Sequence, residues 1–490
     1  MLPASRGRLF LLICRPIALV AVTGLRAWAA QPAQATQAGG FAGRWEGHID
    51  VVGTRLVIVV NVADEGPALK ATIDIPQQMA KGLPLTNVRY ESPKVHFELP
   101  AGPGLAVFDG TLKEGTITGT FEQAGVKGTF ELQRPGAATN EPAAPAEPPP
   151  PYKQEEVKIQ SGMVTLAGTL TLPPSAGPFP AVVLITGSGP QNRDEEVFGL
   201  KPFRMIADHL TRQGVAVLRC DDRGIGGSTG STSQASSADF ADDALAGVQF
   251  LKARPEIDKA RIGLLGHSEG GLVAPIAASR SADVAFIVLL SGPAVTGERI
   301  MLAQAQLLMR AGGAREEQIR RNAEIQKRIF AAVRTGLGWD EAAAMLRTDI
   351  KAGLDALPEA QRKALPDQEA FIKSRVDAQL TMPRTPWFKY FLDYDPAPTL
   401  AKVKCPVLAI FGELDLQVPV GLNRDAMEQA LKSGGNRQHE LHVLPRANHL
   451  YQDAKTGGVQ EYTILKKEFV PELLPLLTSW ILKQGPATRR

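Results

Sequence analysis

Hydrophobic and polar positions alternate with a period of two over residues 41–134. Segments such as RLVIVVNV, KVHFEL and GTITGTFE follow this period, and Gly, Pro, Asn and Asp separate them. Alternation of this kind predicts short strands with one buried face, joined by turns. Because no helical segment interrupts them, the strands predict a small all-β domain, either a barrel or a sandwich.

From residue 153 to the C-terminus the pattern is different. Short apolar runs alternate with longer amphipathic segments; the runs are AVVLIT, VAVL, IGLLG, AFIVLL, VLAIF and ELHVL. This alternation predicts a mostly parallel sheet flanked by helices over residues 153–490. It stops between residues 296 and 385, where the sequence is polar, Ala-rich and helical in pattern. The position of this insert between two core strands favours a helical lid, although a plain pair of solvated helices has the same pattern.

Two further segments lie outside these domains. Residues 135–152 are rich in Pro and Ala and predict an extended linker. Residues 1–30 contain four arginines, no acidic residue, an interrupted apolar run and the cleavage-like sequence Ala27-Trp28-Ala29. These features predict a signal peptide and an exported protein, periplasmic or secreted. A membrane anchor is the alternative, but the run is shorter than the roughly 20 residues that span a bilayer, so we expect no stable span after signal removal.

Length and composition agree with a globular protein of more than one domain. The chain has 490 residues, of which 44% are hydrophobic, so it can bury a large core. Its formal net charge is only +3, which the four arginines of residues 1–30 already exceed. The rest of the chain has no basic surplus, and we expect no nucleic-acid partner. Cys220 and Cys405 adjoin opposite ends of parallel runs, which predicts two separate, mostly buried thiols.

The stretch LLGHSEGG holds the candidate nucleophile, Ser268. This serine directly follows the buried run Ile262–Leu265 and precedes the Ala-rich, helical LVAPIAAS. A strand, a sharp turn and a helix, with glycines on both sides of the serine, form the nucleophile elbow of G-x-S-x-G. Glycine is needed there because neighbouring backbones pass closely.

A serine hydroxyl needs a histidine to accept its proton and an acid to orient that histidine. Of the seven histidines, His449 lies in the loop just past the predicted strand HELHVL, and we take it as the candidate base. The acid is expected beyond the strand VLAIF, where Asp415 is the first choice and Glu413 the reserve. Asp393 and Asp395 precede that strand, at the wrong end of the sheet, and are expected to be turn and cap residues.

Backbone N–H groups are expected to stabilise the negative oxygen of a tetrahedral intermediate. One candidate is the N–H of Glu269, at the start of the predicted helix. The other comes from the loop ITGSGPQNRD, where we expect the N–H of Ser188 or of Gly189. The Glu269 carboxylate would oppose the developing charge if it faced the site. We therefore predict that it points away and pairs with Arg193 or Arg223.

Residues 153–490 resemble α/β-hydrolases of the secreted esterase and serine-aminopeptidase-like group. The resemblance rests on ITGSGPQNRD, RCDDRGIGGS, GHSEGG, GELDLQVP and NHLYQ, which occur in the order of that family. It implies an α/β-hydrolase fold, a mostly parallel sheet with a helical lid insert. It also implies a triad of Ser268, Asp415 and His449, oxyanion donors at Ser188 and Glu269, and a structural loop at Asp222-Arg223-Gly224. GIGGSTG lacks the spacing of a dinucleotide-binding loop, so no cofactor or metal is expected.

Three functions fit these residues. The first is a carboxylesterase-like serine hydrolase that cleaves small or medium acyl esters through an acyl-enzyme. The second is a serine aminopeptidase or amidase with the same triad and a peptide or amide substrate. The third, of a different class, is an envelope protein that binds a ligand through the β domain.

Overall fold

The computed structural model describes residues 40–485, except for short gaps. The gaps are residues 52–53, 65–68, 76–79, 101–104, 124–125, 135–148, 357–358, 360–361, 363–367 and 463. The predicted signal peptide and most of the predicted linker lie outside the described residues. The chain forms two compact units. The first comprises residues 1–147 and 335–383, and the second comprises residues 148–334 and 384–490.

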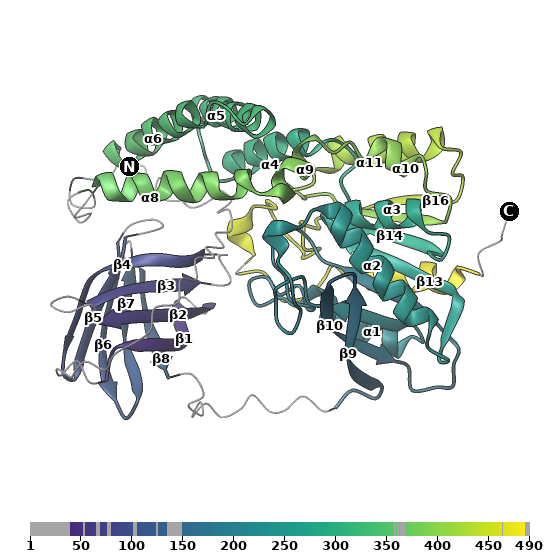
Figure 1. Ribbon diagram of the computed structural model, residues 1–490, viewed down its shortest axis with the longest axis horizontal. Coiled ribbons are helices and arrows are strands. Elements are labelled where there is room, and N and C mark those ends of the chain that lie inside the picture. The colour runs from purple at the N-terminus through teal and green to yellow at the C-terminus, as the bar shows by residue number, and fades with distance from the viewer. Residues whose placement is uncertain are drawn as a thin grey trace, which may run out of the picture. The chain divides into compact units, whose positions relative to one another are not determined.

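The first unit contains a closed antiparallel barrel, coloured purple to blue in Figure 1. Each strand pairs with its neighbour in sequence, and β1 also pairs with β8, which closes the barrel. The strands are β1 Gly43–Val51, β2 Thr54–Asp64, β3 Leu69–Ile75, β4 Ala80–Glu91, β5 Lys94–Leu99, β6 Ala106–Lys113, β7 Thr116–Gln123 and β8 Val126–Gln133. The predicted all-β domain is therefore confirmed, and of the two predicted forms it is the barrel.

Aromatic side chains fill the interior of the barrel. Trp45, Phe97 and Phe108 are fully buried. Phe108 stacks on Phe97 with ring centroids 4.6 Å apart and meets Phe121 and Phe130 edge-on. Contacts of this kind add to the hydrophobic stabilisation of a core. The barrel therefore encloses a packed core of its own.

The second unit is built on an eight-stranded mixed sheet with the order β16-β15-β14-β13-β11-β12-β10-β9. Its strands are β9 Lys153–Ser161, β10 Val164–Leu172, β11 Phe179–Ile185, β12 Ala216–Cys220, β13 Ile257–His267, β14 Phe286–Leu290, β15 Val407–Gly412 and β16 His439–Leu444. Neighbours from β12 to β16 are parallel, whereas β9 and β10 form an antiparallel hairpin at one edge. The predicted mostly parallel sheet is confirmed.

The chain reverses its direction of winding at β11. In register, Val183 of β11 lies beside Leu218 of β12 on one side and Leu264 of β13 on the other. The chain runs from β11 to β12 and then crosses back to β13. Ligands of open parallel sheets bind at such a switch point, beyond the carboxyl ends of the strands. The fold therefore predicts that a ligand site lies at the loops that follow β11 and β13.

Helices cover both faces of this sheet (Figure 1). Alternate residues of β11 serve the two cores: Val183 belongs to the cluster with α2, α3 and α11, and Val182 to the cluster with α1 and α12. The helices are α1 Pro202–Arg212, α2 Ser237–Lys252, α3 Gly270–Arg280, α10 Ala397–Leu400, α11 Val420–Ser433 and α12 Leu473–Lys483, with short 3₁₀ helices η3 Thr232–Gln234 and η5 Val459–Glu461. Strands that are apolar on both faces follow directly from this layering.

The insert between β14 and β15 is helical, as its sequence predicts. It contains α4 Gly297–Ala311, α5 Glu316–Thr335, α6 Trp339–Asp355, α8 Gln368–Thr381, η4 Met382–Arg384 and α9 Pro386–Asp393. Helices α6 and α8 belong to the first compact unit, whereas α4, α5 and α9 belong to the second apart from the last residue of α5. The insert is thus divided between the two units.

Two negative findings apply to the described ranges alone. No helix there has the length and apolar character that a membrane crossing requires, and no group of His, Cys, Asp and Glu side chains there is arranged to hold a metal ion. Cys220, at the end of β12, and Cys405, just before β15, are free and partly buried. Burial raises the pKa of each thiol to about 12.

The packed barrel interior leads to a stability prediction. Phe108→Ala removes a fully buried ring from the centre of the aromatic cluster, and Phe→Ala changes in cores cost about 3–5 kcal/mol. Hydrogen-exchange mass spectrometry of the full chain should show faster exchange in peptides of β5–β8. Peptides of β13 and β14, in the other unit, serve as the internal control and should keep their protection. Unchanged exchange in the barrel would contradict the packed-core description.

Candidate active site

Ser268 occupies a strained turn between β13 and α3. Its φ of +54° lies in the left-handed region, which costs a non-glycine residue about 1–3 kcal/mol. Two backbone hydrogen bonds hold the turn: Ser268 N–H donates to Leu290 of β14 at 2.8 Å, and Gly271 N–H donates to Ser268 at 2.9 Å. The predicted strand, sharp turn and helix are all present, and they lift Ser268 beyond the carboxyl edge of the sheet.

Close backbone approaches explain the glycines of this elbow. A Cβ atom on Gly266 would overlap the carbonyl group of Gly270, and one on Gly270 would overlap the carbonyl group of Ile185 in β11. A Cβ on Gly271 would lie 2.6 Å from the Cα of Gly292, closer than real Cβ contacts come. The elbow therefore packs backbone against backbone on both neighbouring strands.

Asp415 and His449 meet at the same edge of the sheet, in the loops after β15 and β16. The His449 Nδ1–H donates to Asp415 Oδ2 at 2.8 Å. The other oxygen, Oδ1, accepts the N–H groups of Gln417 at 2.8 Å and Val418 at 2.9 Å. Burial alone would raise the pKa of Asp415, but His449 and these donors outweigh burial and hold that pKa below its ordinary value.

The other candidate acids have different partners. Glu413 is exposed and accepts the backbone N–H of Arg446 at 2.8 Å. Asp393 binds Arg334, and Asp395 accepts a backbone N–H at the start of α10. Of these four acids, Asp415 is the one with a hydrogen bond to His449 among the described residues. Asp395 has the cap role expected from sequence, whereas Asp393 forms an ion pair instead.

Ser268 itself forms no hydrogen bond with His449 within the described part of the chain. The residue before it, His267, does reach that loop, because its Nε2–H donates to the carbonyl oxygen of His449 at 2.9 Å. The two imidazole rings lie 4.7 Å apart between centroids. Apo hydrogen bonds of catalytic groups are often long and tighten with substrate bound.

The loop after β11 passes beside the elbow. A Cβ atom on Gly187 would lie 3.3 Å from the Cβ of Ser268. The candidate donors, the N–H groups of Ser188, Gly189 and Glu269, have no hydrogen-bond acceptor among the described residues. Gly189 has a φ of +94°, a conformation that other residues rarely adopt. These N–H groups are therefore free for an oxyanion.

Two carboxylates anchor this loop, and the sequence singled out Asp222 but not Glu195. Glu195 Oε1 accepts the N–H of Gly187 at 2.7 Å. Asp222 accepts the Thr186 hydroxyl at 2.7 Å and the N–H of Gln191 at 2.8 Å. Removal from water raises the pKa of Asp222 well above its ordinary value. The resemblance implied only a structural role for residues 222–224, and Asp222 has such a role.

Several known proteins are similar to this chain. The sequence profile of the family described as "Serine aminopeptidase, S33" matches residues 201–332, which include Ser268. "Esterase EstD" of Thermotoga maritima is 26% identical over 376 residues, which cover 76% of this chain and 75% of that protein. The chain has the α/β-hydrolase fold and is similar to hydrolases of the esterase-like group.

Two solved structures are also similar to this hydrolase. An esterase of Pyrococcus furiosus has 19% identity and a TM-score of 0.41, covering 68% of this chain and 91% of its own. The α/β-hydrolase GrgF of Penicillium sp. sh18 has 18% identity and a TM-score of 0.43, covering 68% and 99%. The assignment of the fold rests on the strand order and connectivity of the sheet.

The prediction that Glu269 pairs with an arginine is wrong. Glu269 of the hydrolase is 3% exposed, and its Oε1 accepts the hydroxyl of Ser237 in α2 at 2.6 Å and the indole N–H of Trp387 in α9 at 2.7 Å. Burial raises the pKa of Glu269, and the hydrogen bonds from Ser237, Trp387 and Ser188 offset burial only in part. Neutral donors from three different segments therefore take the place of the expected cation.

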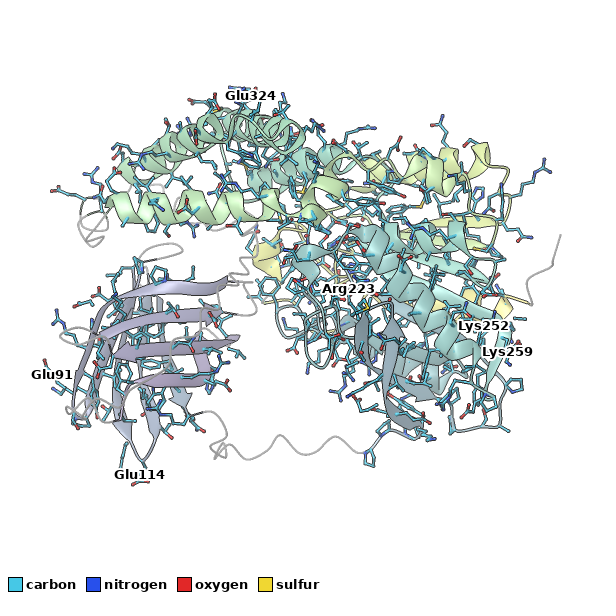
Figure 2. The ribbon with its side chains drawn as sticks, viewed as in Figure 1. Glu91, Glu114, Arg223, Lys252, Lys259 and Glu324 are labelled. Atoms are coloured by element: carbon cyan, nitrogen blue, oxygen red, sulfur yellow. The ribbon has the colours of Figure 1, made fainter. Side chains whose placement is uncertain are left out.

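Nearer acids explain why the arginines are not available. Arg193 binds Asp221 at 2.8 Å through Nη2 and also reaches Glu156. Arg223, labelled in Figure 2, binds Asp243 of α2 at 2.7 Å. Each arginine stands at the expected end of the sheet, but acids of β9 and of the loop after β12 neutralise Arg193, and an acid of α2 neutralises Arg223.

A small cavity lies next to the candidate oxyanion loop, on the α2 side of β11. Its volume is about 60 Å³, and its lining includes Thr186, Gly187, Gly189, Asp222, Phe240 and Val273. Apolar walls with a few convergent polar groups are typical of small-molecule sites. The cavity therefore extends the candidate site of the hydrolase beneath the loop.

The surroundings of Glu269 lead to a pH-dependent prediction. An unfolded Glu has a pKa of about 4.3, and a raised folded pKa means that stability falls as pH rises from about 4.3 through the folded value. Glu269→Gln keeps a carbonyl acceptor for Ser237 and Trp387 but has no charge to bury. The melting temperature of the variant minus that of the wild type should therefore increase between pH 4.5 and pH 8.

The matched control is Glu324→Gln, at an exposed glutamate that binds Lys327 on the surface of α5. It should show no such trend, because an exposed ion pair contributes little at any pH. A melting temperature of Glu269→Gln that falls relative to the wild type as pH rises would contradict the argument.

Proposed function

We propose that this hydrolase is a serine hydrolase that cleaves carboxylic esters of small or medium acyl groups. The observation that carries the proposal is the buried Asp415–His449 hydrogen bond at the same sheet edge as Ser268 in its strained elbow. The similarity to Esterase EstD supports an ester in preference to an amide. No cofactor takes part in the proposed reaction.

In the proposed reaction, Asp415 holds His449 with its proton on Nδ1, so that Nε2 has a free lone pair. Nε2 takes the proton of Ser268 while the serine oxygen attacks the ester carbonyl carbon. His449 then returns the proton to the alcohol oxygen as the C–O bond breaks, which leaves an acyl-enzyme. A water molecule, deprotonated by His449 in the same way, releases the acid and restores Ser268.

The negative oxygen of each tetrahedral intermediate requires donors that are already in place. The unbonded N–H groups of Ser188 or Gly189 and of Glu269 fill this role in the proposal. Glu269 precedes the first turn of α3, so the partial positive charge of the helix N-terminus adds to its effect.

Two alternatives have weaker support. An aminopeptidase needs an acid that is open to a substrate ammonium group, and the description of the matched family raises this possibility. Among the described residues Glu269 has no basic partner, but it is buried and already accepts hydrogen bonds from Ser237, Trp387 and Ser188. Ligand capture inside the barrel is disfavoured by the aromatic side chains that fill it. We also infer export from the predicted signal peptide, which suits an enzyme acting on substrates outside the cytoplasm.

The proposed triad predicts the effect of three substitutions. Ser268→Ala, His449→Ala and Asp415→Asn should each lower kcat by about 10⁴-fold or more, and a double variant should be little worse than either single one. Glu413→Gln is the control and should retain wild-type activity, because Glu413 binds only a loop N–H. Steady-state kinetics on one ester suffices, and near-native turnover by Ser268→Ala would refute the proposal.

The proposed substrate class is tested with a panel of p-nitrophenyl esters and aminoacyl p-nitroanilides. Esters of short and medium acyl chains should have the larger kcat/KM, because an ester has the better leaving group and meets the same N–H donors. Higher kcat/KM for anilides with a free amino terminus would establish the aminopeptidase alternative.

A further inference from the structure

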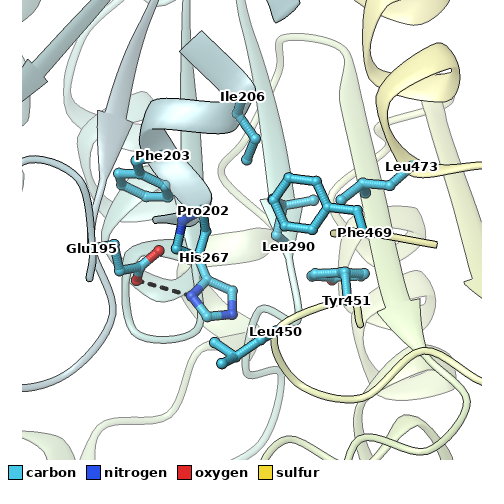
Figure 3. Close-up of a pocket in the computed structure, with 10 residues that line it drawn as sticks. All are labelled: Glu195, Pro202, Phe203, Ile206, His267, Leu290, Leu450, Tyr451, Phe469 and Leu473. Carbon is cyan, nitrogen blue, oxygen red and sulfur yellow. Dashed lines mark hydrogen bonds and ion pairs between the residues drawn. The ribbon is translucent and has the colours of Figure 1, made fainter. Parts of the chain in front are cut away.

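A second histidine–acid pair lies directly behind the proposed nucleophile. His267 is the last residue of β13, and its Nδ1 lies 2.9 Å from Glu195 Oε1 (Figure 3). The His267 side chain is 7% exposed and that of Glu195 is 2% exposed. Glu195 has a φ of +52°, in the left-handed region, so the loop accepts strain to place it there. Neither residue has a part in the triad.

The hydrogen bonds of this pair fix its protonation. His267 Nε2 faces the carbonyl oxygen of His449 at 2.9 Å, and a carbonyl oxygen can only accept. Glu195 Oε1 already accepts the N–H of Gly187 at 2.7 Å. With Glu195 ionised, both ring nitrogens of His267 face acceptors, and each carries a proton. The geometry thus favours an imidazolium ion beside a carboxylate.

The other groups around His267 agree with this charge state. The titratable groups that face it are Glu195, Asp415 through its negative charge, the His449 ring, and Tyr451, whose ring lies 6.4 Å away. Burial alone would lower the pKa of His267, but Glu195, the His449 carbonyl and Asp415 outweigh burial and raise it.

An apolar shell encloses the pair. Pro202, Phe203, Leu290, Leu450 and Phe469 line a cavity of about 10 Å³ beside it (Figure 3). Glu195 Oε2 is buried and has no hydrogen-bond partner among the described residues. The space suffices for no more than about one water molecule. Bulk water therefore does not screen the attraction between the two charges.

We propose that His267 and Glu195 form a charged positioning pair that aligns the oxyanion loop and the catalytic-histidine loop with Ser268. On one side the pair holds Gly187, which adjoins the candidate donor Ser188; on the other side it holds the backbone of His449. His267 itself is covalently attached to Ser268. The inference rests on the proposed function, since it concerns the alignment of that triad.

An ion pair satisfies all three contacts, whereas a glutamine at position 195 does not. If Glu195 were Gln, a carbonyl oxygen at the Oε1 position would accept from Gly187 but would leave the imidazolium without a counter-charge. An amide NH₂ at that position would donate to the unprotonated Nδ1 of neutral His267 but would face the Gly187 N–H, donor against donor. Glu195→Gln is therefore nearly equal in volume yet misaligns one loop or the other.

The charged state is tested directly by NMR of ¹⁵N-histidine-labelled protein at pH 8. An ordinary histidine, with a pKa of about 6.5, is neutral at that pH. We expect one histidine with both ring nitrogens protonated, assigned to His267 by its absence from His267→Gln, and the loss of one of its two ring protons in Glu195→Gln. A wild-type His267 with a single ring proton at pH 8 would overturn the proposal.

The positioning role is tested by kinetics. Misplacement of catalytic groups by about 1 Å can cost about 10²-fold in rate. Glu195→Gln and His267→Gln should therefore lower kcat by about 10- to 100-fold, with KM changed less than about threefold, while the folded spectrum is retained. Unchanged kcat in a Glu195→Gln variant that has lost the ring proton would overturn the positioning role.

An exposed pair of the same types provides the matched control. His442 and Glu440 lie 3.4 Å apart on the surface of β16. Glu440→Gln should leave both kcat and KM unchanged. If His267→Gln does not fold, Glu195→Gln and the wild-type spectrum still decide the question. The spectrum does not depend on catalysis, so full activity of Ser268→Ala would refute the proposed function without altering the NMR result.

Discussion

The close backbone packing of the elbow after β13 is the constraint on which the site depends. Gly266 and Gly270 bring the turn against its own helix and against β11, while the N–H of Ser268 is bonded to β14. A side chain at either glycine would push the strands apart. The positive φ of Ser268 is thus maintained between β11 and β14, which are buried on both faces, and such packing can bear a strain of about 1–3 kcal/mol.

Buried carboxylates around the elbow differ in behaviour because their partners differ. Asp415 faces a histidine and backbone N–H groups, and its pKa falls. Glu269 faces only neutral donors, and its pKa rises. Glu195 faces His267 and forms the charged pair behind the nucleophile. The same side-chain chemistry therefore serves to orient a base, to tie segments together and to align loops, and the choice follows from which donor the fold supplies.

These contacts also tie the insert to the active site. Trp387 lies in α9, near the end of the insert, yet its indole N–H donates to the carboxylate of Glu269, the residue that follows Ser268. The N-terminus of α2 reaches the same carboxylate through Ser237. Movement of α9 would therefore displace the Glu269 side chain. The backbone N–H of the same residue is a proposed oxyanion donor. The barrel, in contrast, has an apolar core of its own, with aromatic rings at its centre.

The sequence by itself determined the features that depend on local pattern. The period-two alternation identified the barrel strands, the doubly apolar runs identified the parallel sheet, and glycines around one serine identified the elbow. The order of Ser268, Asp415 and His449 along those runs made them the first choice for a triad, with Glu413 as the reserve acid, and the structure joins the last two by a hydrogen bond. The strands and the elbow are each set within about ten residues, so spacing alone predicts them.

Only the tertiary structure decided which charged groups meet. Arg193 and Arg223 were at the expected end of the sheet, but Asp221 and Asp243 bind them, so Glu269 is left with neutral donors. His267 stood at the end of a buried run, where a titratable residue needs a partner, but Glu195 lies 72 residues earlier in the chain. Pairing between residues far apart in the chain depends on where several loops converge. The periodicity of the sequence does not show which of several acidic residues will pair with a given arginine or histidine. The sequence pattern therefore predicted which strands and turns carry the site. The packing of its loops decided which charged side chains pair there.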